Sequence, residues 1–538
     1  MNLWSTLSRT TFVASLFLAL LISSAWSHDG VHHTSSINES TAFKLPITSS
    51  SELFSVEFVT RNVKGEPTPA FLAVKYADSW QWIMLEQPFL ANPRTDAQRS
   101  YRPQWRTKYP IHSNGRTQIR LPKGRYVLYA GKGLEYAPVK HVFEVAADNK
   151  TSVDVTLKRY IDMPAKGWWS GDTHVHAPRF GVKDNRGLLW AAQAEDIHIS
   201  SILLMGDKEF LHFPQYALGK DGTHREGDFW LVPGQEEPRT SELGHTIMLN
   251  TQRLYRNTDD YYRYDAIFRK SRNDGALTGI AHFYGDKFLS RNAGALLLAE
   301  DLVDFVELMD DTGMFKPEHF YDALNMGARL SLSAGSDFPW GGHIGDNRTY
   351  VLLEEGVEFN PDNWYAALKA GRSFVTQGPL LDFKINGQSI GSDLHVKKGD
   401  RIDITVRTEG HPDVSSPKKL WLVSMGHTIK KIDTERRDAG VLEFQLTLTA
   451  ERSQWFAVAA EGYKGAVAHS SPIYVHVDGG PVTAKPEKLT LLYEENIARI
   501  DRMGKAEFVP EEQRAHFILW LDHVRTIYLK KIAALNRE

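Results

Sequence analysis

Residues 168–176 read Trp-Trp-Ser-Gly-Asp-Thr-His-Val-His, a strand-like stretch that ends in two histidines with one residue between them. Successive side chains of a strand point to opposite faces, so His174 and His176 share a face and aim at one point beyond the strand end. Neutral imidazole is a good ligand for divalent Zn, Fe, Mn, Co or Ni. A lone His-x-His pattern occurs by chance in many strands, so a metal site requires further ligands elsewhere in the chain.

Further residues of the ligand type follow at the ends of later apolar stretches. Each stands where a strand-like run meets a small or turn-forming residue, and they are Glu236, His245, His282 and Asp337. In βα barrels, residues remote in sequence meet at the carboxyl ends of the strands. Four histidines and two carboxylates meeting there would hold two divalent ions, with one carboxylate as a bridge, and would generate hydroxide at neutral pH.

Each of these residues also has a structural reading when taken alone. A single buried histidine is usually a core residue bonded to the backbone, Glu236 could pair with Arg239, and Asp337 could cap a turn before Pro339. The same small-residue context recurs at every position, so the set as a whole favours a metal site.

The composition describes an ordinary globular protein. The chain has 538 residues, of which 42% are hydrophobic and 24% charged, and its formal net charge is −3. This balance implies no nucleic-acid partner, and the length implies about two to four domains. The chain has no cysteine, which excludes a disulfide framework and a lipid-anchor cysteine.

The first residues have the pattern of an export signal. A weakly basic start is followed by an apolar run at 11–21 and by the small-x-small site Ala25-Trp26-Ser27. The run is short for a membrane span, so the sequence predicts a signal peptide at 1–27, no membrane anchor, and a periplasmic or secreted protein.

Strand and helix patterns change along the chain and predict several domains. Short strands with turns come first, alternating strand and helix signals follow, alternating apolar residues then return, and the tail has helical spacing. The predicted segments after the signal peptide are an N-terminal β-sandwich at 46–162, repeated βα units at 165–378, a C-terminal β-sandwich at 380–478 and a helical hairpin at 484–538.

The ligand-bearing motifs stand at 171–176, 234–236, 244–245, 281–282 and 335–337. In this order they resemble the motifs of the PHP (polymerase and histidinol phosphatase) metallohydrolases, and most closely those of the carbaryl-hydrolase-like (CehA/McbA) branch. Segments 194–198, 347–351 and 370–380 also resemble that branch. The layout of domains is similar too, so the resemblance extends over nearly all of the chain after the signal peptide.

The resemblance implies a multidomain α/β plus β protein. Its distorted βα barrel of the PHP type, at 165–378, is flanked by the N-terminal β-sandwich and by the C-terminal β-sandwich with its helical tail. In this family pattern, the first metal ion is held by His174, His176 and Asp337. Glu236 bridges, and His245 with His282 holds the second ion. Zn, Mn and Fe all fit these ligands.

Two positions depart from the family pattern. The usual Asp-His after the second strand is Asp207-Lys208 here, and the last Asp-x-His is Asp337-Phe338-Pro339. Both changes remove ligands of a third ion, so the resemblance implies a site for two ions only.

Four residues are candidates to assist catalysis, and each has an alternative. Lys208 would place positive charge where a third ion would sit, or form a surface salt bridge. His343 would replace a missing ligand or act as a general acid, since histidine titrates near neutrality, or be a loop histidine with no role. Arg348 and Arg179 would bind a substrate anion or stabilise developing negative charge, or form ordinary salt bridges.

These patterns predict an exported, dinuclear hydrolase of the PHP class. Metal-bound hydroxide would cleave an ester, carbamate or amide in a small-molecule substrate. A phosphoesterase on the same site is an alternative, although no segment resembles a dedicated phosphate cradle. A non-catalytic exported protein that binds carbohydrate or envelope is the alternative from another class, because aromatic content is high. Metal identity, natural substrate and oligomeric state stay open.

Overall fold

A computed structural model describes residues 52–79, 83, 111–147, 150–284, 289–309, 315–340 and 342–537. The expected signal peptide at 1–27 lies outside the described residues, so export stays a prediction. All of the described residues belong to one compact unit, Ile47–Glu538. No helix within these ranges combines the length and the apolar character that crossing a membrane requires.

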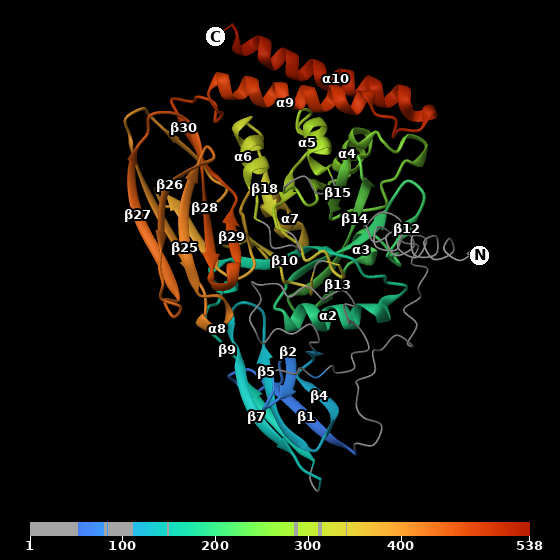
Figure 1. The fold of residues 1–538 in the computed structure, drawn as a ribbon, viewed down its shortest axis with the longest axis vertical. Coiled ribbons are helices and arrows are strands. Elements are labelled where there is room, and N and C mark those ends of the chain that lie inside the picture. Colours follow the sequence, from blue (N-terminus) through green and yellow to red (C-terminus); the bar gives the residue numbers. More distant parts are fainter. Residues whose placement is uncertain are drawn as a thin grey trace, which may run out of the picture. The chain divides into compact units, whose positions relative to one another are not determined.

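In the N-terminal region, the elements that the structure describes are all strands (Figure 1). One sheet has the order β4-β1-β8 and a second has the order β3-β2-β5-β7. Phe58 of the first sheet meets Phe143 of the second, with ring centroids 5.5 Å apart. The strands are β1 (Leu53–Arg61), β2 (Ala70–Tyr76), β3 (Ile111–Ser113), β4 (Arg116–Pro122), β5 (Gly124–Gly131), β7 (Val139–Val145) and β8 (Thr151–Thr156), and a short pair joins β6 (Tyr136–Ala137) to β9 (Lys158–Arg159).

The central region carries the ligand motifs and alternates strands with helices. Its strands are β10 (Trp168–Val175), β11 (Ile199–Gly206), β12 (Leu211–His212), β13 (His224–Glu226), β14 (Phe229–Thr240), β15 (Gly244–Leu249), β16 (Leu277–Ile280), β17 (Phe305–Glu307), β18 (Ser331–Ser333), β19 (Arg348–Leu352) and β20 (Ser373–Thr376). Its helices are α2 (Asn185–Ala194), α3 (Gly219–Gly222), α4 (Tyr264–Asn273), α5 (Ser290–Leu297), α6 (Glu318–Asn325) and α7 (Pro361–Lys369).

The expected fold class, with a distorted βα barrel of the PHP type at 165–378, is wrong. Parallel ladders join β10 to β11, β11 to β14, β16 to β17 and β17 to β18. Antiparallel ladders join β10 to β19, β14 to β15, β15 to β16 and β19 to β20. The turn between β14 and β15 is too short for the helical crossover that a parallel pair requires. The result is a mixed sheet in a mainly β protein.

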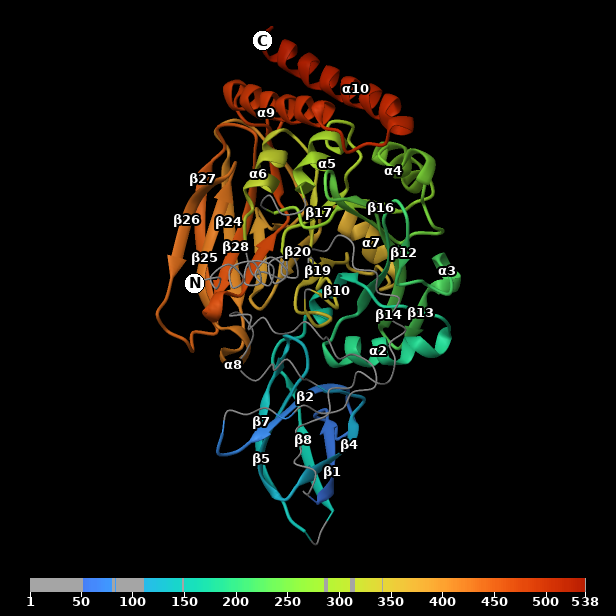
Figure 2. The ribbon, with the colours of Figure 1, turned by 45° about the vertical axis from the view of Figure 1, so that its right-hand side comes forward.

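This sheet also runs on into the C-terminal region, instead of ending at a separate flanking sandwich. β20 pairs with β29, and the connected strands form a 17-stranded sheet. The strands that continue it are β23 (Asp393–Val396), β25 (Pro417–Ser424), β26 (His427–Asp433), β28 (Gln454–Gly462), β29 (Val467–Ser470) and β30 (Ile473–Val477). A four-stranded sheet accompanies them, and its strands are β22 (Gln388–Ser389), β21 (Leu380–Ile385), β24 (Arg401–Glu409) and β27 (Val441–Thr449), with the short helix α8 (Pro412–Ser415) nearby in the chain (Figure 2).

Two long helices end the chain, α9 (Pro486–Lys505) and α10 (Glu511–Leu535), and they lie side by side (Figures 1 and 2). Their apolar residues join a core that includes side chains of α4, α5 and α6. Tyr528 donates a hydrogen bond to the carbonyl of Ala295, and the indole of Trp520 donates one to Glu300. The helices therefore support the central region from the side of α5.

A buried ionic network joins the N-terminal strands to the central region. Arg159 pairs with Glu135 and with Asp196, and Lys132 lies 3.9 Å from Asp196. Tyr350 of β19 donates a hydrogen bond to Glu135. Asp196 follows α2, so this network holds the start of β11 in place.

Candidate metal centre

His174 lies near the end of β10 and His176 directly follows this strand, and their rings meet edge-on at an interplanar angle of 74°. Their Nε2 atoms are 3.0 Å apart. The other ring nitrogen of each histidine has its own partner: Nδ1 of His174 is 2.9 Å from Oε2 of Glu307, and Nδ1 of His176 is 3.1 Å from the carbonyl oxygen of Leu203. Both rings are buried.

These partners determine which ring nitrogens carry a proton. A carbonyl oxygen only accepts, so Nδ1 of His176 is the donor, and the carboxylate of Glu307 likewise accepts from Nδ1 of His174. Both Nε2 atoms, 3.0 Å apart, are then the ring nitrogens left to bind a cation. At metal sites, histidines commonly have this orientation: one ring nitrogen donates to a carboxylate or carbonyl oxygen, and the other binds the metal ion.

Two carboxylates complete this cluster. Oδ1 of Asp337 is 3.4 Å from Nε2 of His174 and 3.7 Å from Nε2 of His176. Oε2 of Glu236 is 3.3 Å from Nε2 of His176 and 3.9 Å from Nε2 of His174. Both carboxylates therefore lie against the facing nitrogen atoms.

The remaining two predicted histidines also belong to this cluster, and the ring of His282 stacks on that of His174 with centroids 5.2 Å apart. Nδ1 of His245 is 2.8 Å from Oε1 of Glu236, and Nε2 of His282 is 3.5 Å from Oδ2 of Asp337. The rings of His245 and His282 are 5.5 Å apart between centroids. The structure thus brings all six predicted ligands, from five separate segments, into one buried cluster.

Buried histidine and carboxylate groups in this cluster could hold a metal ion. Two sets have one ligand atom per residue within 4.8 Å of one another: His174, His176 and Asp337, and His174, Glu236 and His282. His174 belongs to both sets, whereas the sequence predicted it for the first ion only. His245 contacts the second set through Glu236.

The buried carboxylate of Asp172 joins two of the segments that carry the candidate ligands. Asp172 accepts hydrogen bonds from the backbone N–H groups of His174, Ser336 and Gly345, at 3.1, 2.9 and 2.8 Å. It therefore ties β10 to the loop that carries Asp337. Burial raises the pKa of Asp172 to about 6, while these hydrogen bonds oppose the rise.

Two of the ligands have a strained backbone. His282 has φ of 52° and Asp337 has φ of 50°, in the left-handed region that side-chain-bearing residues rarely adopt. Such strain persists where the surrounding structure enforces it, and it is common at functional sites.

The electrostatics of the cluster favours a cation at its centre. Burial lowers the pKa of His174, but Glu307 and Asp337 outweigh burial and raise it well above its usual value. Burial raises the pKa of Glu236, but Arg239 and His245 outweigh burial and hold it well below its usual value. Burial, assisted by Arg239, lowers the pKa of His245 to about 3.

The arginines and the lysine that the sequence singled out lie elsewhere. Arg348 is buried and donates to the carbonyls of Gly345 and Glu195, so its contacts are structural. The side chain of Lys208 is exposed, and its Nζ lies 3.8 Å from Oε1 of Glu209. Lys208 thus forms a surface salt bridge, which is the alternative that the sequence left open.

Arg179 also makes structural contacts. It donates to Gln215 at 2.5 Å, to Asn185 at 3.2 Å and to the carbonyl of Gly222 at 2.9 Å. These acceptors belong to the loops around α2 and α3.

His343 lies next to a different histidine. Its ring is 6.3 Å from that of His112 between centroids, and its backbone N–H donates to Asp346. The role of His343 as an acid therefore stays a prediction.

Aromatic side chains line one side of the cluster. The rings of Phe213 and Trp340 each lie 5.3 Å from that of His176, and they contact each other at 5.3 Å. Both side chains are only half-buried. They therefore form a solvent-accessible apolar wall beside the candidate ligands.

Sequence reasoning missed Glu307, which holds His174 from behind. Glu307 ends β17, and its other oxygen accepts a hydrogen bond from Thr173 at 3.3 Å. The available signal was a carboxylate at the end of the apolar run 305–308. A charged residue at such a strand end is unusual unless it has a buried partner.

We expect Glu307→Gln to weaken metal binding about 10- to 100-fold, because the amide keeps the shape but loses the charge that polarises His174. A titration with metal ions against a competing chelator would measure this change. Glu318→Gln, at an exposed glutamate of α6, is the matched control. Equal affinities in both variants would show that Glu307 does not support the site.

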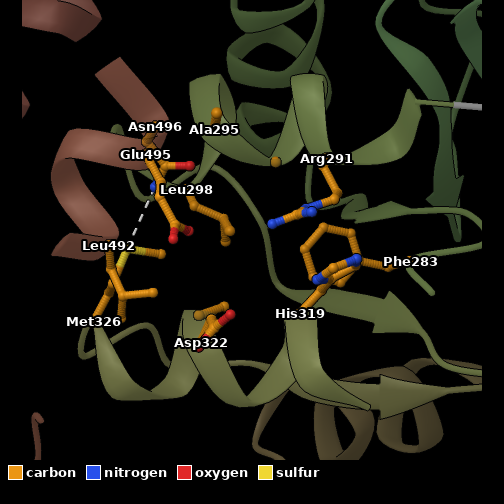
Figure 3. A pocket seen from close by; sticks show the side chains of 12 residues that line it. Phe283, Arg291, Ala295, Leu298, His319, Asp322, Met326, Leu492, Glu495 and Asn496 are labelled. Atoms are coloured by element: carbon orange, nitrogen blue, oxygen red, sulfur yellow. Dashed lines mark hydrogen bonds between the residues drawn. The ribbon is translucent and has the colours of Figure 1, made fainter. Parts of the chain in front are cut away.

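A small pocket lies apart from this cluster, between α5, α6 and α9 (Figure 3). Arg291, His319, Asp322 and Glu495 are among its lining residues, and none of the six candidate ligands is. It is therefore separate from the candidate metal centre.

Comparisons with known proteins assign no family. No family model matches the chain, and no curated protein matches it. The major pilin subunit BcpA of Bacillus cereus is similar over 79% of this chain and 69% of its own, at 8% identity and a TM-score of 0.23. The Bacillus anthracis TIE protein is similar over 79% and 50%, at 8% identity and a TM-score of 0.14. Likenesses this weak carry no functional argument.

Proposed function

We propose that this protein is a dinuclear metal-dependent hydrolase whose ligands are His174, His176, Glu236, His245, His282 and Asp337. The observation that carries the proposal is the pair of Nε2 atoms of His174 and His176, which lie 3.0 Å apart between two carboxylates. Imidazole nitrogen and carboxylate oxygen suit Zn, Mn or Fe.

The residues divide into two groups around the carboxylates. Glu236 has one oxygen toward His176 and the other toward His245, so it is suited to bridge two ions. Asp337 likewise has one oxygen toward His174 and the other toward His282. When bound, two divalent ions supply a hydroxide at neutral pH and polarise the bond to be cleaved. The order of the motifs, similar to that of PHP metallohydrolases, supports hydrolysis as the reaction.

The protein groups would position the substrate. Phe213 and Trp340 offer an apolar wall on the side of His176, which suits an aromatic or other apolar group of the substrate. This supports an ester, carbamate or amide with such a group as the substrate class. The expected signal peptide would place the reaction in the periplasm or outside the cell.

Metal stoichiometry after chelation and reloading tests the proposal. We expect two equivalents per chain and metal-dependent turnover on a panel of chromogenic esters, carbamates, amides and phosphoesters. Substitution of His176 by alanine should reduce both, whereas His224→Ala, in the hairpin strand β13, should change neither. Absence of bound metal would contradict the proposal, and metal without turnover would favour a binding protein.

Removal of the metal should also destabilise the fold. An ion that binds only the folded chain stabilises it by mass action, by about 2.7 kcal/mol at a hundredfold excess over Kd. We therefore expect chelation to lower the Tm by about 3 °C or more, and reloading to restore it. An unchanged Tm in the presence of the chelator would contradict a site buried within the folded chain.

A further inference from the structure

Arg239 lies on the same strand as Glu236 and faces the same cluster. Residues three apart on a regular strand point to opposite faces, but the ladder between β14 and β15 shifts register between Glu236 and Arg239. The shift re-aims the strand, so Nε of Arg239 comes to 3.7 Å from Oε2 of Glu236. Arg239 is also the cross-strand partner of His245.

The guanidinium of Arg239 is buried but poorly satisfied. The residue is 6% exposed, and its Nε and Nη2 atoms find no hydrogen-bond acceptor among the residues that the structure describes. The buried guanidinium of Arg348, by contrast, donates to two backbone carbonyls. Buried donors without acceptors are costly and call for a further partner, such as a ligand.

A simple ion pair with Glu236 does not account for Arg239. Charge-assisted hydrogen bonds between guanidinium and carboxylate are commonly about 2.7–2.9 Å long and often bidentate. The 3.7 Å approach of Arg239 is longer than a hydrogen bond, and both oxygens of Glu236 already face histidines. The carboxylate is directed toward the imidazoles, which leaves the guanidinium donors for another acceptor.

We propose that Arg239 is a substrate-binding residue that receives a negatively charged oxygen of the substrate, of the carboxylate or phosphate type. The inference rests on the proposed function and deepens it: the enzyme would prefer esters or amides that carry an anionic group over neutral ones. Arg239 thus takes the role that the sequence suggested for Arg348 and Arg179, whose guanidinium groups donate to the backbone carbonyls of Glu195 and Gly222.

Anion binding by the metal-reloaded protein tests this inference. Three variants are compared with the unaltered chain: Arg239→Gln, Arg239→Lys and, as a control, Arg225→Gln at an exposed arginine of β13. Calorimetric titrations with inorganic phosphate and, separately, with benzoate distinguish the two kinds of anion. Metal content is measured on every sample.

We expect Arg239→Gln to keep two equivalents of metal and to bind at least one of the anions about 10- to 100-fold more weakly. Arg239→Lys should bind more tightly than Arg239→Gln, because the charge is kept, and Arg225→Gln should bind normally. In turnover assays, Arg239→Gln should raise KM for anionic substrates and leave neutral ones nearly unchanged.

Equal anion affinities in Arg239→Gln and the unaltered chain would overturn the inference. Loss of metal in Arg239→Gln would also overturn it, since the arginine would then act only by supporting Glu236. Failure of the unaltered chain to bind metal would instead contradict the proposed hydrolase. In that case the same anion titrations, run without metal, would still test Arg239. Weaker anion binding by Arg239→Gln than by the unaltered chain would support an anion site at Arg239, and equal binding would overturn the inference.

Discussion

Replacement of Glu236 by glutamine should lower turnover at least about 100-fold and reduce bound metal from two equivalents to one or none. Glu236 faces His176 with one oxygen and His245 with the other, so it is placed, like Asp337, between two pairs of candidate ligands. The amide of glutamine lacks the negative charge and one of the two acceptor oxygens. Metal analysis and chromogenic turnover on the reloaded variant would measure the two effects.

The neighbouring glutamate provides a matched control for this substitution. Glu237 is buried like Glu236, but it pairs with Arg256 away from the six ligands. Burial raises the pKa of Glu237 to about 7, against the opposing effect of Arg256. Glu237→Gln should therefore keep its metal and most of its turnover. Equal losses in the two variants would mean that the bridging carboxylate is wrongly assigned.

Substitution of Gly335 by alanine should lower the free energy of unfolding by about 3 kcal/mol or more and displace the candidate ligand His174. A Cβ atom at Gly335 would lie 2.5 Å from the backbone nitrogen of His174, closer than any real contact. Because the obstacle is backbone, β10 or the loop of Asp337 must move. Denaturant unfolding and metal content, measured on the same sample, would record both consequences.

Gly181→Ala is the control for this second substitution. Gly181 has an extended backbone, with φ of −173°, and no atom lies within 4 Å of the position of an added Cβ. Its stability should stay within about 0.5 kcal/mol of the unaltered chain. Normal stability and metal content in Gly335→Ala would contradict the close approach of this loop to β10.

Local patterns in the sequence predicted several elements well. Helices were expected to alternate with strands within 165–378, and α2 (Asn185–Ala194) and α7 (Pro361–Lys369) are two of the helices found there. Helical periodicity and a starting proline are local signals, because they depend on residues within one or two turns. The ligand positions could be anticipated for a related reason, since each follows an apolar strand-like run.

The sheet topology could not be predicted in the same way. Alternating strands and helices suggested parallel βα units, but β14 and β15 form an antiparallel hairpin, and β20 pairs with β29 almost a hundred positions later in the chain. Strand pairing depends on contacts between distant segments, which a periodic pattern does not record.

The sequence by itself determined which side chains are available for a metal site: two histidines on one face of a strand, and four more ligands at the ends of apolar runs. Only the tertiary structure decided that Glu307 orients His174, that a register shift turns Arg239 toward Glu236, and that Arg348 and Arg179 are directed elsewhere. The physical reason is that residue chemistry and strand alternation are local properties, whereas the partner of a buried charge is set by how remote strands pack.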